Sequence, residues 1–323
     1  MTFLDFQAIK AQLDQKFHRF FKPSIFLKFV PDEMGCISVL QFFNYVLRKV
    51  SLMQARLDLS YYDADNDGFL VESELNQYVA DLIPSLKLDS LNPSVHQYYI
   101  CSSVRKFLFF MDPLKRGKIA IQKILLSPIL TELFELREPE LPEDYERTNW
   151  FSAFSALKIY GQYLSLDTDQ NGMISRSEMS KFNNGTLTDL YLDRVYEERQ
   201  TRRGNMDYKT FVDFVLAIEN PNAPESITYQ FKLLDVKAQG YLDDFTIGYL
   251  FKSVVEKMIS FGHEPVHVAD VVNEVFDMAN PKVGDKITLE DLLKCGVGGT
   301  ITTILTDCRG FWAYDNRESL EGR

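Results

Sequence analysis

The sequence predicts an all-α fold in which helix–loop–helix units follow one another along the chain. Two twelve-residue segments, 63–74 and 167–178, are rich in acidic residues and carry a glycine at their sixth position. On both sides of them, apolar residues recur at steps of three and four, the pattern of a helix with one buried face. Weaker copies of the segment begin 33 residues before the first and 32 residues after the second. Such self-similarity predicts serial repeats of one structural unit.

The first segment, 63–74 (loop one), has the residue types of an EF-hand calcium loop. Ca²⁺ takes about six to eight oxygen ligands at roughly 2.3–2.6 Å, and alternate residues of a tight turn can supply them. Acidic residues stand at positions 1, 3, 5 and 12, a glycine at position 6 permits the turn, and water is expected at position 9. The predicted ligands are Asp63, Asp65, Asp67, Glu74 with both carboxylate oxygens, and Phe69 with its main-chain carbonyl.

The second segment, 167–178 (loop two), repeats this pattern, with Ser175 at position 9 to orient a water. Its predicted ligands are Asp167, Asp169, Asn171, Glu178 and the main-chain carbonyl of Met173. The sequence therefore predicts two bound Ca²⁺ ions, with loop one the tighter site because it has four ligand carboxylates against three. The alternative is that both loops fold without metal, which leaves clustered carboxylates in mutual repulsion.

Other copies of the loop lack ligands and are predicted to be degenerate. Because EF-hands usually occur in pairs, we expect 30–41 to be the silent partner of loop one and 199–210 that of loop two. In 112–123, a lysine at position 12 argues against calcium. Segment 235–246 has Lys237, Gln239 and Thr246 where ligands should stand, and 276–291 is a stretched copy.

The apolar periodicity predicts where the helices and domains lie. Expected helices cover 1–22, 38–62, 72–83, 94–111, 150–166 and 207–218. In the helix at 150–166, the predicted inner face consists of Phe154, Leu157 and Leu164. A charged segment with two prolines, 137–147, is the predicted linker. It divides the chain into an N-terminal domain, 1–136, and a C-terminal domain, 148–323, with one complete loop each.

An aromatic stretch near the N-terminus allows two interpretations. Pro23 interrupts any helix there, and the apolar side chains around it are dense. They could form a docking segment for a partner protein, or a connector that faces the core. The candidate partner-binding residues are Phe20, Phe21, Ile25, Phe26 and Phe29.

Composition narrows the function classes. The formal net charge of −11 argues against a nucleic-acid footprint. Four cysteines lie far apart without a Cys-x-x-Cys pair, which indicates reduced intracellular thiols. No apolar run is long enough to span a bilayer, and the N-terminus lacks a signal-peptide pattern. We therefore expect a cytosolic or nuclear protein. The sequence also lacks a metalloprotease helix motif, a P-loop and a nucleophile elbow, and so offers no catalytic constellation.

Several segments in the second half of the chain, taken in order with the two complete loops, resemble the B'' regulatory subunits of protein phosphatase 2A. The resemblance covers nearly the whole chain and is strongest to the gamma type, which includes the plant TONNEAU/FASS proteins that organise cortical microtubules. The segments that carry it are Arg194–Glu198, Gly204–Tyr208, Phe211–Asn220, Ile227–Tyr229, Phe231–Asp235, Phe276–Met278 and Ile287–Leu292.

The resemblance implies a regulator and not an enzyme. Such subunits dock on a helical-repeat scaffold subunit that also holds the catalytic subunit, and they recruit phosphoprotein substrates. Calcium in the loops would stabilise the shape that docks. The TONNEAU/FASS branch adds a cytoskeletal or centrosomal location as a possibility.

Two other functions remain as alternatives. A free-standing calcium sensor or buffer would need several complete paired loops and a Met-rich groove, whereas here each pair has one complete loop and the chain has nine methionines. A calcium-dependent enzyme would need a catalytic constellation, which none of the motifs above supplies, although carboxylates alone could form one.

Overall fold

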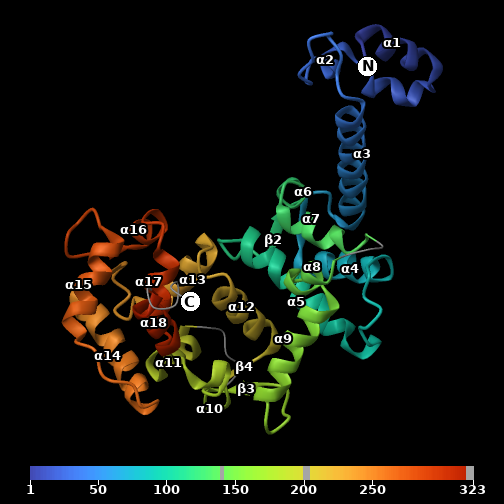
Figure 1. The fold of residues 1–323 in the computed structure, drawn as a ribbon. Coiled ribbons are helices and arrows are strands. Elements are labelled where there is room, and N and C mark those ends of the chain that lie inside the picture. The colour runs from blue at the N-terminus through green and yellow to red at the C-terminus, as the bar shows by residue number, and fades with distance from the viewer. Residues whose placement is uncertain (139–141, 199–203, 318–323) are drawn as a thin grey trace. The chain divides into compact units, whose positions relative to one another are not determined.

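The computed structural model describes residues 1–138, 142–198 and 204–317, and helices dominate it (Figure 1). The chain forms two compact units. Unit 1 consists of Met1–Leu70 and Ala120–Ser127, and unit 2 of Val71–Ile119 and Pro128–Arg323. Among the described helices, none is both long and apolar enough to cross a membrane.

Unit 1 begins with short helices and continues into one long helix. Its elements are α1 (Phe3–Gln12), η1 (Gln15–Phe20), α2 (Pro23–Phe26), α3 (Val39–Tyr62), β1 (Phe69–Val71, whose last residue falls in unit 2) and α6 (Ile121–Leu125). Thr2 caps α1, since its hydroxyl accepts the Asp5 N–H while the Asp5 carboxylate accepts the Thr2 N–H. The predicted helix 1–22 is thus wrong in extent, because Leu13 adopts an extended conformation and ends α1.

An aromatic cluster forms the core of the N-terminal part of unit 1. Phe6 is fully buried at its centre, with its ring centroid 4.8 Å from that of Phe21 and 5.3 Å from those of Phe26 and Phe42. Such edge-to-face and tilted contacts are favourable for aromatic rings. The buried members are Phe6, Phe20, Phe21, Ile25, Phe26, Ile37 and Phe42.

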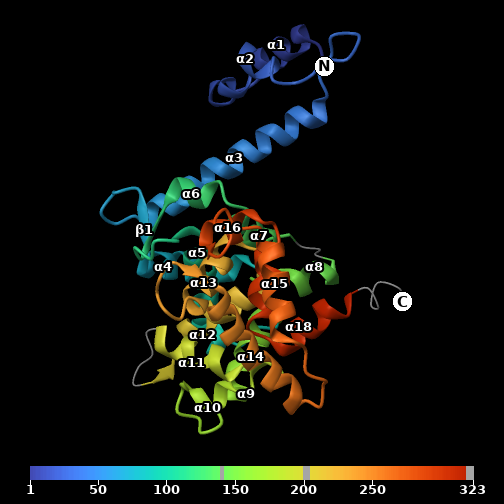
Figure 2. The same cartoon turned by 90° about the vertical axis from the view of Figure 1, so that its left-hand side faces the viewer.

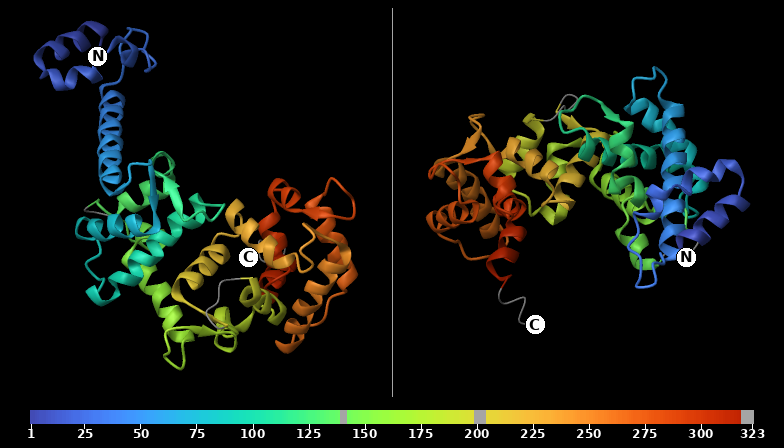
Figure 3. Two further views of the ribbon diagram at one scale, coloured as in Figure 1. Left: turned by 180° about the vertical axis from the view of Figure 1, so that it is seen from behind. Right: turned by 90° about the horizontal axis from the view of Figure 1, so that it is seen from above.

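Helix α3 has the extent that the sequence predicts, and Figure 3 shows it in blue as one uninterrupted helix. Ser38 caps it by accepting the Gln41 N–H at 3.3 Å. Its buried residues are Phe42, Ala55 and Leu59.

Unit 2 contains most of the helices. In chain order they are α4 (Glu72–Leu82), η2 (Ile83–Ser85), η3 (Pro93–Val95), α5 (His96–Met111), α7 (Pro128–Glu135), α8 (Glu143–Thr148), α9 (Ala153–Leu166), α10 (Arg176–Met179), η4 (Phe182–Gly185), α11 (Asp189–Glu198), α12 (Tyr208–Glu219), α13 (Pro224–Leu234), α14 (Asp244–Ser260), α15 (Val268–Ala279), α16 (Leu289–Lys294), α17 (Gly298–Ile304) and α18 (Cys308–Asp315). The strands are β2 (Lys118–Ala120, whose last residue falls in unit 1), β3 (Ile174–Ser175), β4 (Asn205–Met206), β5 (Tyr241–Leu242) and β6 (Ile287–Thr288).

Short antiparallel strands join the loops in pairs. Ile174 of loop two lies opposite Met206, and Leu242 lies opposite Ile287. All four side chains are fully buried, so the eighth position of each loop contributes to the core. The predicted partner of loop two, 199–210, is confirmed by its described residues, while 199–203 lie outside them.

The predicted partner of loop one is wrong. Within unit 1, loop one lies against the end of the degenerate loop 112–123, since the Ile121 N–H donates to the Gly68 carbonyl at 3.0 Å, and strand β1 pairs with β2. Segment 30–41 pairs instead with the start of the chain. The Ile37 N–H donates to the Met1 carbonyl, and the Met1 amino group donates to the Ile37 carbonyl. The main-chain N–H and carbonyl of Ile37, at position 8 of this segment, are therefore already hydrogen-bonded. The Ile37 side chain packs into the aromatic cluster.

The predicted linker does not separate two domains. Within unit 2, the segments on either side of it bind each other: the Asn149 side chain donates to the Glu132 carbonyl at 2.7 Å, and the Trp150 indole N–H donates to the Ser102 carbonyl at 3.2 Å. Residues 71–119 consequently share one unit with the rest of the C-terminal half. Prolines and charges are typical of a connection between helices, but they do not indicate whether the two helices belong to one core or to two. Residues 139–141 lie outside the described residues.

Helix α9 buries a different face from the predicted one. Phe154, Leu157 and Leu164 are 51%, 38% and 50% exposed. The buried residues are Ala153, Ser155, Ala156, Ile159, Tyr163 and Leu166. Apolar residues lie on most sides of this helix, so their spacing could not choose the face; the small side chains allow α9 to approach α5 and α12.

The C-terminal core of unit 2 lies among α13 to α18 (Figure 2). Helix α14 packs beside α15, and α17 packs against both α13 and α18. At Gly299, an added Cβ would lie 2.5 Å from the Pro221 carbonyl oxygen, so only glycine allows this approach. The four cysteines, all described, are free thiols.

Candidate calcium sites

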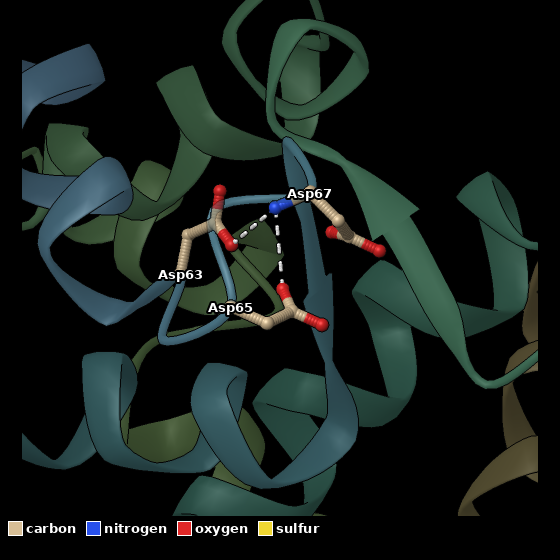
Figure 4. Close-up of side chains that lie close together, drawn as sticks. All are labelled: Asp63, Asp65 and Asp67. Atoms are coloured by element: carbon tan, nitrogen blue, oxygen red, sulfur yellow. Dashed lines mark hydrogen bonds between the residues drawn. The ribbon is translucent and has the colours of Figure 1, made fainter.

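Loop one gathers three carboxylates around one point. Carboxylate oxygens of Asp63, Asp65 and Asp67 lie within 4.8 Å of one another (Figure 4). Two oxygens that ligate one Ca²⁺ at about 2.3–2.6 Å lie at most about 5 Å apart, so this spacing fits a single ion. Asp63 is buried and the other two are exposed.

Main-chain amides hold these carboxylates in place. Asp63 accepts the N–H groups of Asp67 at 3.1 Å and Gly68 at 2.9 Å, and Asp67 accepts that of Phe69 at 2.8 Å. Asn66 and Gly68 have positive φ angles of 57° and 80°, which turn the chain back on itself. The residue types at these positions, Asn and Gly, are those that tolerate this conformation best.

The expected ligand at position 12 of loop one lies in the first turn of α4. There, Glu74 accepts the Val71 N–H at 2.9 Å. Phe69, whose carbonyl is the expected ligand at position 7, begins strand β1. The assignment of Glu74 and Phe69 as ligands stays a prediction from their loop positions.

Loop two forms a second cluster, and it includes its position 12. Oxygens of Asp167, Asp169 and Glu178 lie within 4.8 Å of one another, and Asp167 and Glu178 are buried. Asp167 accepts the N–H groups of Asn171 at 3.1 Å and Gly172 at 2.9 Å, the same bonds that Asp63 makes in loop one. The Asn171 side chain donates to Asp169 at 2.8 Å.

Glu178 connects the two ends of loop two. One carboxylate oxygen accepts the N–H and hydroxyl of Thr168, both at 2.7 Å, and the other accepts the N–H and hydroxyl of Ser175 at 2.9 and 2.8 Å. Burial by itself would raise the pKa of Glu178, but these hydrogen bonds outweigh it and lower the pKa to about 2. Glu178 therefore remains ionised at neutral pH, which a calcium ligand requires.

Tyrosines of helices α9 and α11 support loop two. The Tyr163 hydroxyl of α9 donates to the Gly172 carbonyl at 2.7 Å, and the Tyr196 hydroxyl of α11 donates to the Ile174 carbonyl at 2.9 Å. Met173, the expected carbonyl ligand, lies between these two anchored residues. The sequence reasoning missed both tyrosines and Thr168; a hydroxyl at position 2 of the loop was the available signal for Thr168.

Comparisons with known proteins place the chain in a family. Over 322 residues and 99% of the chain, it is 48% identical to the gamma-type B'' regulatory subunit of serine/threonine-protein phosphatase 2A from Homo sapiens, and the match covers 71% of that relative. The chain belongs to this B'' family. It is also 44% identical, over an aligned length of 336 positions, to TON2 of Arabidopsis thaliana, a probable B'' regulatory subunit of phosphatase 2A. This match covers 99% of this chain and 70% of the relative.

A solved structure extends the similarity to the fold. It carries the designation PP2A PR70 holoenzyme together with the label diCa, and it matches with a TM-score of 0.68 and 27% identity, covering 76% of this chain and 93% of that one. No protein-family model matches the chain. The predictions of B'' membership and of a regulatory rather than catalytic protein are confirmed, and the predominantly helical structure is consistent with the predicted EF-hand type.

In this B'' chain, the candidate partner-binding residues lie mostly inside the protein. Phe20, Phe21, Ile25 and Phe26 are buried in the aromatic cluster, and Phe29 is half-buried with its ring 6.0 Å from that of Phe42. This position matches the second interpretation, a segment that faces the core. Binding of a partner through these residues stays a prediction, and it would require the cluster to open.

Two of the degenerate loops keep the turn of the complete ones. Asp112 accepts the Gly117 N–H at 2.7 Å, and Asp235 accepts the Gly240 N–H at 2.7 Å. The fourth and sixth residues of both loops have positive φ angles, as in loops one and two: Lys115, Gly117, Ala238 and Gly240. The turn therefore depends on the residues at positions 1 and 6, and the ligand positions can change independently.

Proposed function

We propose that this chain is a calcium-binding regulatory subunit of a phosphatase 2A holoenzyme, which docks next to the catalytic subunit on the scaffold subunit and selects phosphoprotein substrates. The observation that carries this proposal is the 48% identity to the gamma-type B'' protein across 99% of the chain. The two carboxylate clusters and the holoenzyme designation of the similar structure support it.

Loops one and two are the proposed sites of two Ca²⁺ ions, with loop one the tighter. Their position-12 glutamates, Glu74 and Glu178, stand in the first turns of α4 and α10. Coordination by these glutamates would fix the start of each helix relative to its loop. Without a cation, clustered carboxylates repel one another, and we expect the helix directions to be less well defined.

Helix α3 offers a surface for the scaffold. Large apolar side chains recur on one side of it at steps of three, four, three, seven and four residues, and Leu40 and Leu57 are 67% and 66% exposed. This spacing is typical of a helix that packs along another helix. The exposed residues of this α3 stripe are Leu40, Phe43, Leu47, Val50, Leu57 and Tyr61. A scaffold of helical repeats, which the family resemblance implies, is a partner of matching chemistry.

Co-elution on a sizing column tests the proposal. The chain is mixed with the phosphatase 2A scaffold–catalytic dimer, once with calcium and once with EDTA. A shift in both supports a regulatory subunit, and a shift only with calcium also supports a metal-shaped docking surface. If neither mixture shifts, the proposed function is contradicted, and a free-standing calcium sensor becomes the better explanation.

Variants of α3 test its role in the same assay. Phe43→Asp places a charge in the α3 stripe, so we expect weaker co-elution. Gln41→Asp adds the same charge two residues away, outside the stripe, and we expect it to co-elute like the unmodified chain. Equal behaviour of the two variants would contradict docking through this stripe.

A further inference from the structure

The degenerate loop 235–246 (loop three) has the backbone of a calcium loop. Asp235 at position 1 accepts the N–H groups of Gln239 at 3.0 Å and Gly240 at 2.7 Å. These bonds correspond to those of Asp167 in loop two. Gly240 has a φ of 82°, and Ala238 has a φ of 51°, which is costly for a residue with a Cβ. Loop three therefore forms this turn although it lacks the usual ligand residues at positions 3, 5 and 12.

Side chains at ligand positions of loop three donate hydrogen bonds instead of offering oxygens. The Lys237 ammonium at position 3 lies 2.9 Å from a carboxylate oxygen of Asp243 at position 9. The Gln239 amide at position 5 donates to the Tyr241 carbonyl at 3.3 Å and to the same Asp243 oxygen at 3.4 Å. In a complete loop, the oxygens at positions 7 and 9 face the cation directly or through water.

The remaining ligand position closes the network. Thr246 at position 12 donates its hydroxyl and N–H to the second oxygen of Asp243. The Lys237 ammonium also lies 4.5 Å from the centre of the Phe245 ring, a distance at which a cation is attracted to an aromatic face. Burial would raise the pKa of Asp243, but the bonds from Thr246, Lys237 and Gln239 hold the pKa well below its usual value.

We infer that the Lys237 ammonium takes the place of the cation in loop three, so that this loop keeps its closed turn at any calcium concentration. The ammonium supplies positive charge and N–H donors to the oxygens that would otherwise need a metal. Calcium would have to displace a bonded lysine and would find a threonine in place of the usual glutamate. Loop three lies outside the two proposed calcium sites.

The loop that pairs with loop three is also closed by its own groups. In 280–291, Asp291 at position 12 accepts the N–H of Thr288 at 2.9 Å and its hydroxyl at 2.6 Å. The two loops meet at Leu242 and Ile287, which are fully buried. The third pair is therefore expected to stay folded without metal.

Ion pairs connect this metal-independent pair to loop two. Asp189 on α11 lies 3.0 Å from Arg176, the first residue of α10, and 3.2 Å from Lys257 on α14. Arg176 also binds Asp193 at 2.6 Å. Helix α10, which follows loop two, is therefore held by ion pairs to α11, and α11 is held to α14. We expect this support to stay folded whether or not loop two binds calcium.

The first test is thermal unfolding of the full chain with calcium and with EDTA. Lys237→Met removes the ammonium and keeps the length of the side chain. We expect its melting temperature to fall by about 2–4 °C, equally in both conditions. Lys282→Met is the matched control, since Lys282 occupies position 3 of the paired loop but is exposed and bonds to Glu290 on the surface. A Lys237→Met variant as stable as this control would overturn the inference.

The second test is a calorimetric titration with calcium. The triple variant Lys237→Asp, Gln239→Asn, Thr246→Glu restores the usual ligands, and we expect one more bound ion than in the unmodified chain. Failure to gain an ion, in a variant that melts like the unmodified chain, would overturn the inference. If the unmodified chain bound no calcium at all, the proposed function of loops one and two would fail, but the EDTA melting comparison would still decide the role of Lys237.

Discussion

Loops two and three, residues 167–178 and 235–246, form the same backbone turn but place side chains of opposite charge at position 3. In both, an aspartate at position 1 accepts the N–H groups of positions 5 and 6. In loop two, three carboxylates converge on one point. In loop three, a lysine binds the carboxylate at position 9. The turn is therefore encoded separately from the ligand positions, so a loop can lack the usual ligand residues and keep its place in the fold.

Position 12 should give the largest difference between the two loops. Glu178→Gln removes a charged ligand, and we expect calcium binding at loop two to weaken by about 100-fold, or ~2.8 kcal/mol at 1.4 kcal/mol per tenfold. Thr246→Ala at the same position of loop three should leave the calcium titration unchanged. Isothermal calorimetry measures both. Unchanged affinity of Glu178→Gln would show that loop two is not a calcium site.

Position 6 should make the two loops behave alike. Gly172 and Gly240 have φ angles of 76° and 82°, and an alanine there is strained by about 1–2 kcal/mol. We expect both Gly→Ala variants to lose about this much stability in urea unfolding, and Gly172→Ala to bind calcium more weakly as well. Gly284→Ala is the control, because that glycine has no positive φ and open space around it. Equal stability of all three variants would contradict the shared turn.

Acid should weaken loop three through Asp243. Its ordinary pKa is 3.8, and hydrogen bonds lower the pKa in the folded protein. The resulting stabilisation is complete above pH 3.8 and is lost as pH falls below that value toward the folded pKa. Asp243→Asn lacks this contribution, so its melting temperature should lie below that of the unmodified chain at pH 7 and approach it in acid. A difference that does not change with pH would contradict the ionic role of Asp243.

The smallest effect is expected at position 4. Ala238 has a φ of 51°, and Ala238→Gly would remove the strain at the cost of a more flexible unfolded chain. The two terms oppose each other, and we expect a net gain of about 0.5 kcal/mol in unfolding free energy. Ala8→Gly, at an exposed position of helix α1, should instead lose about 0.5–1 kcal/mol. A loss at Ala238 as well would show that the turn is not strained there.

Local spacing was sufficient for much of the fold and for the carboxylate cluster of loop two. The pattern at 167–178 predicted Asp167, Asp169 and Glu178, which the structure brings together. Helices such as α3 ended where the periodicity ended. These features depend on residues within a few positions of one another, so the sequence displays them directly. The cytosolic or nuclear location and the cytoskeletal association remain predictions.

Partners distant in the chain were decided by tertiary structure. The sequence alone predicted that helix–loop–helix units repeat, that two loops have the residue types of calcium sites and that the chain resembles the B'' family. It could not show that β1 pairs with β2 and not with 30–41, because a degenerate loop keeps too few of the residues that mark a partner. Nor could it show that Lys237 reaches Asp243, since a lysine at a ligand position indicates a lost site, and only its geometry reveals a replacement for the cation. The strand pairing and the ion pair depend on which side chains are buried and in which direction they point. Both properties follow from the packing of the whole unit.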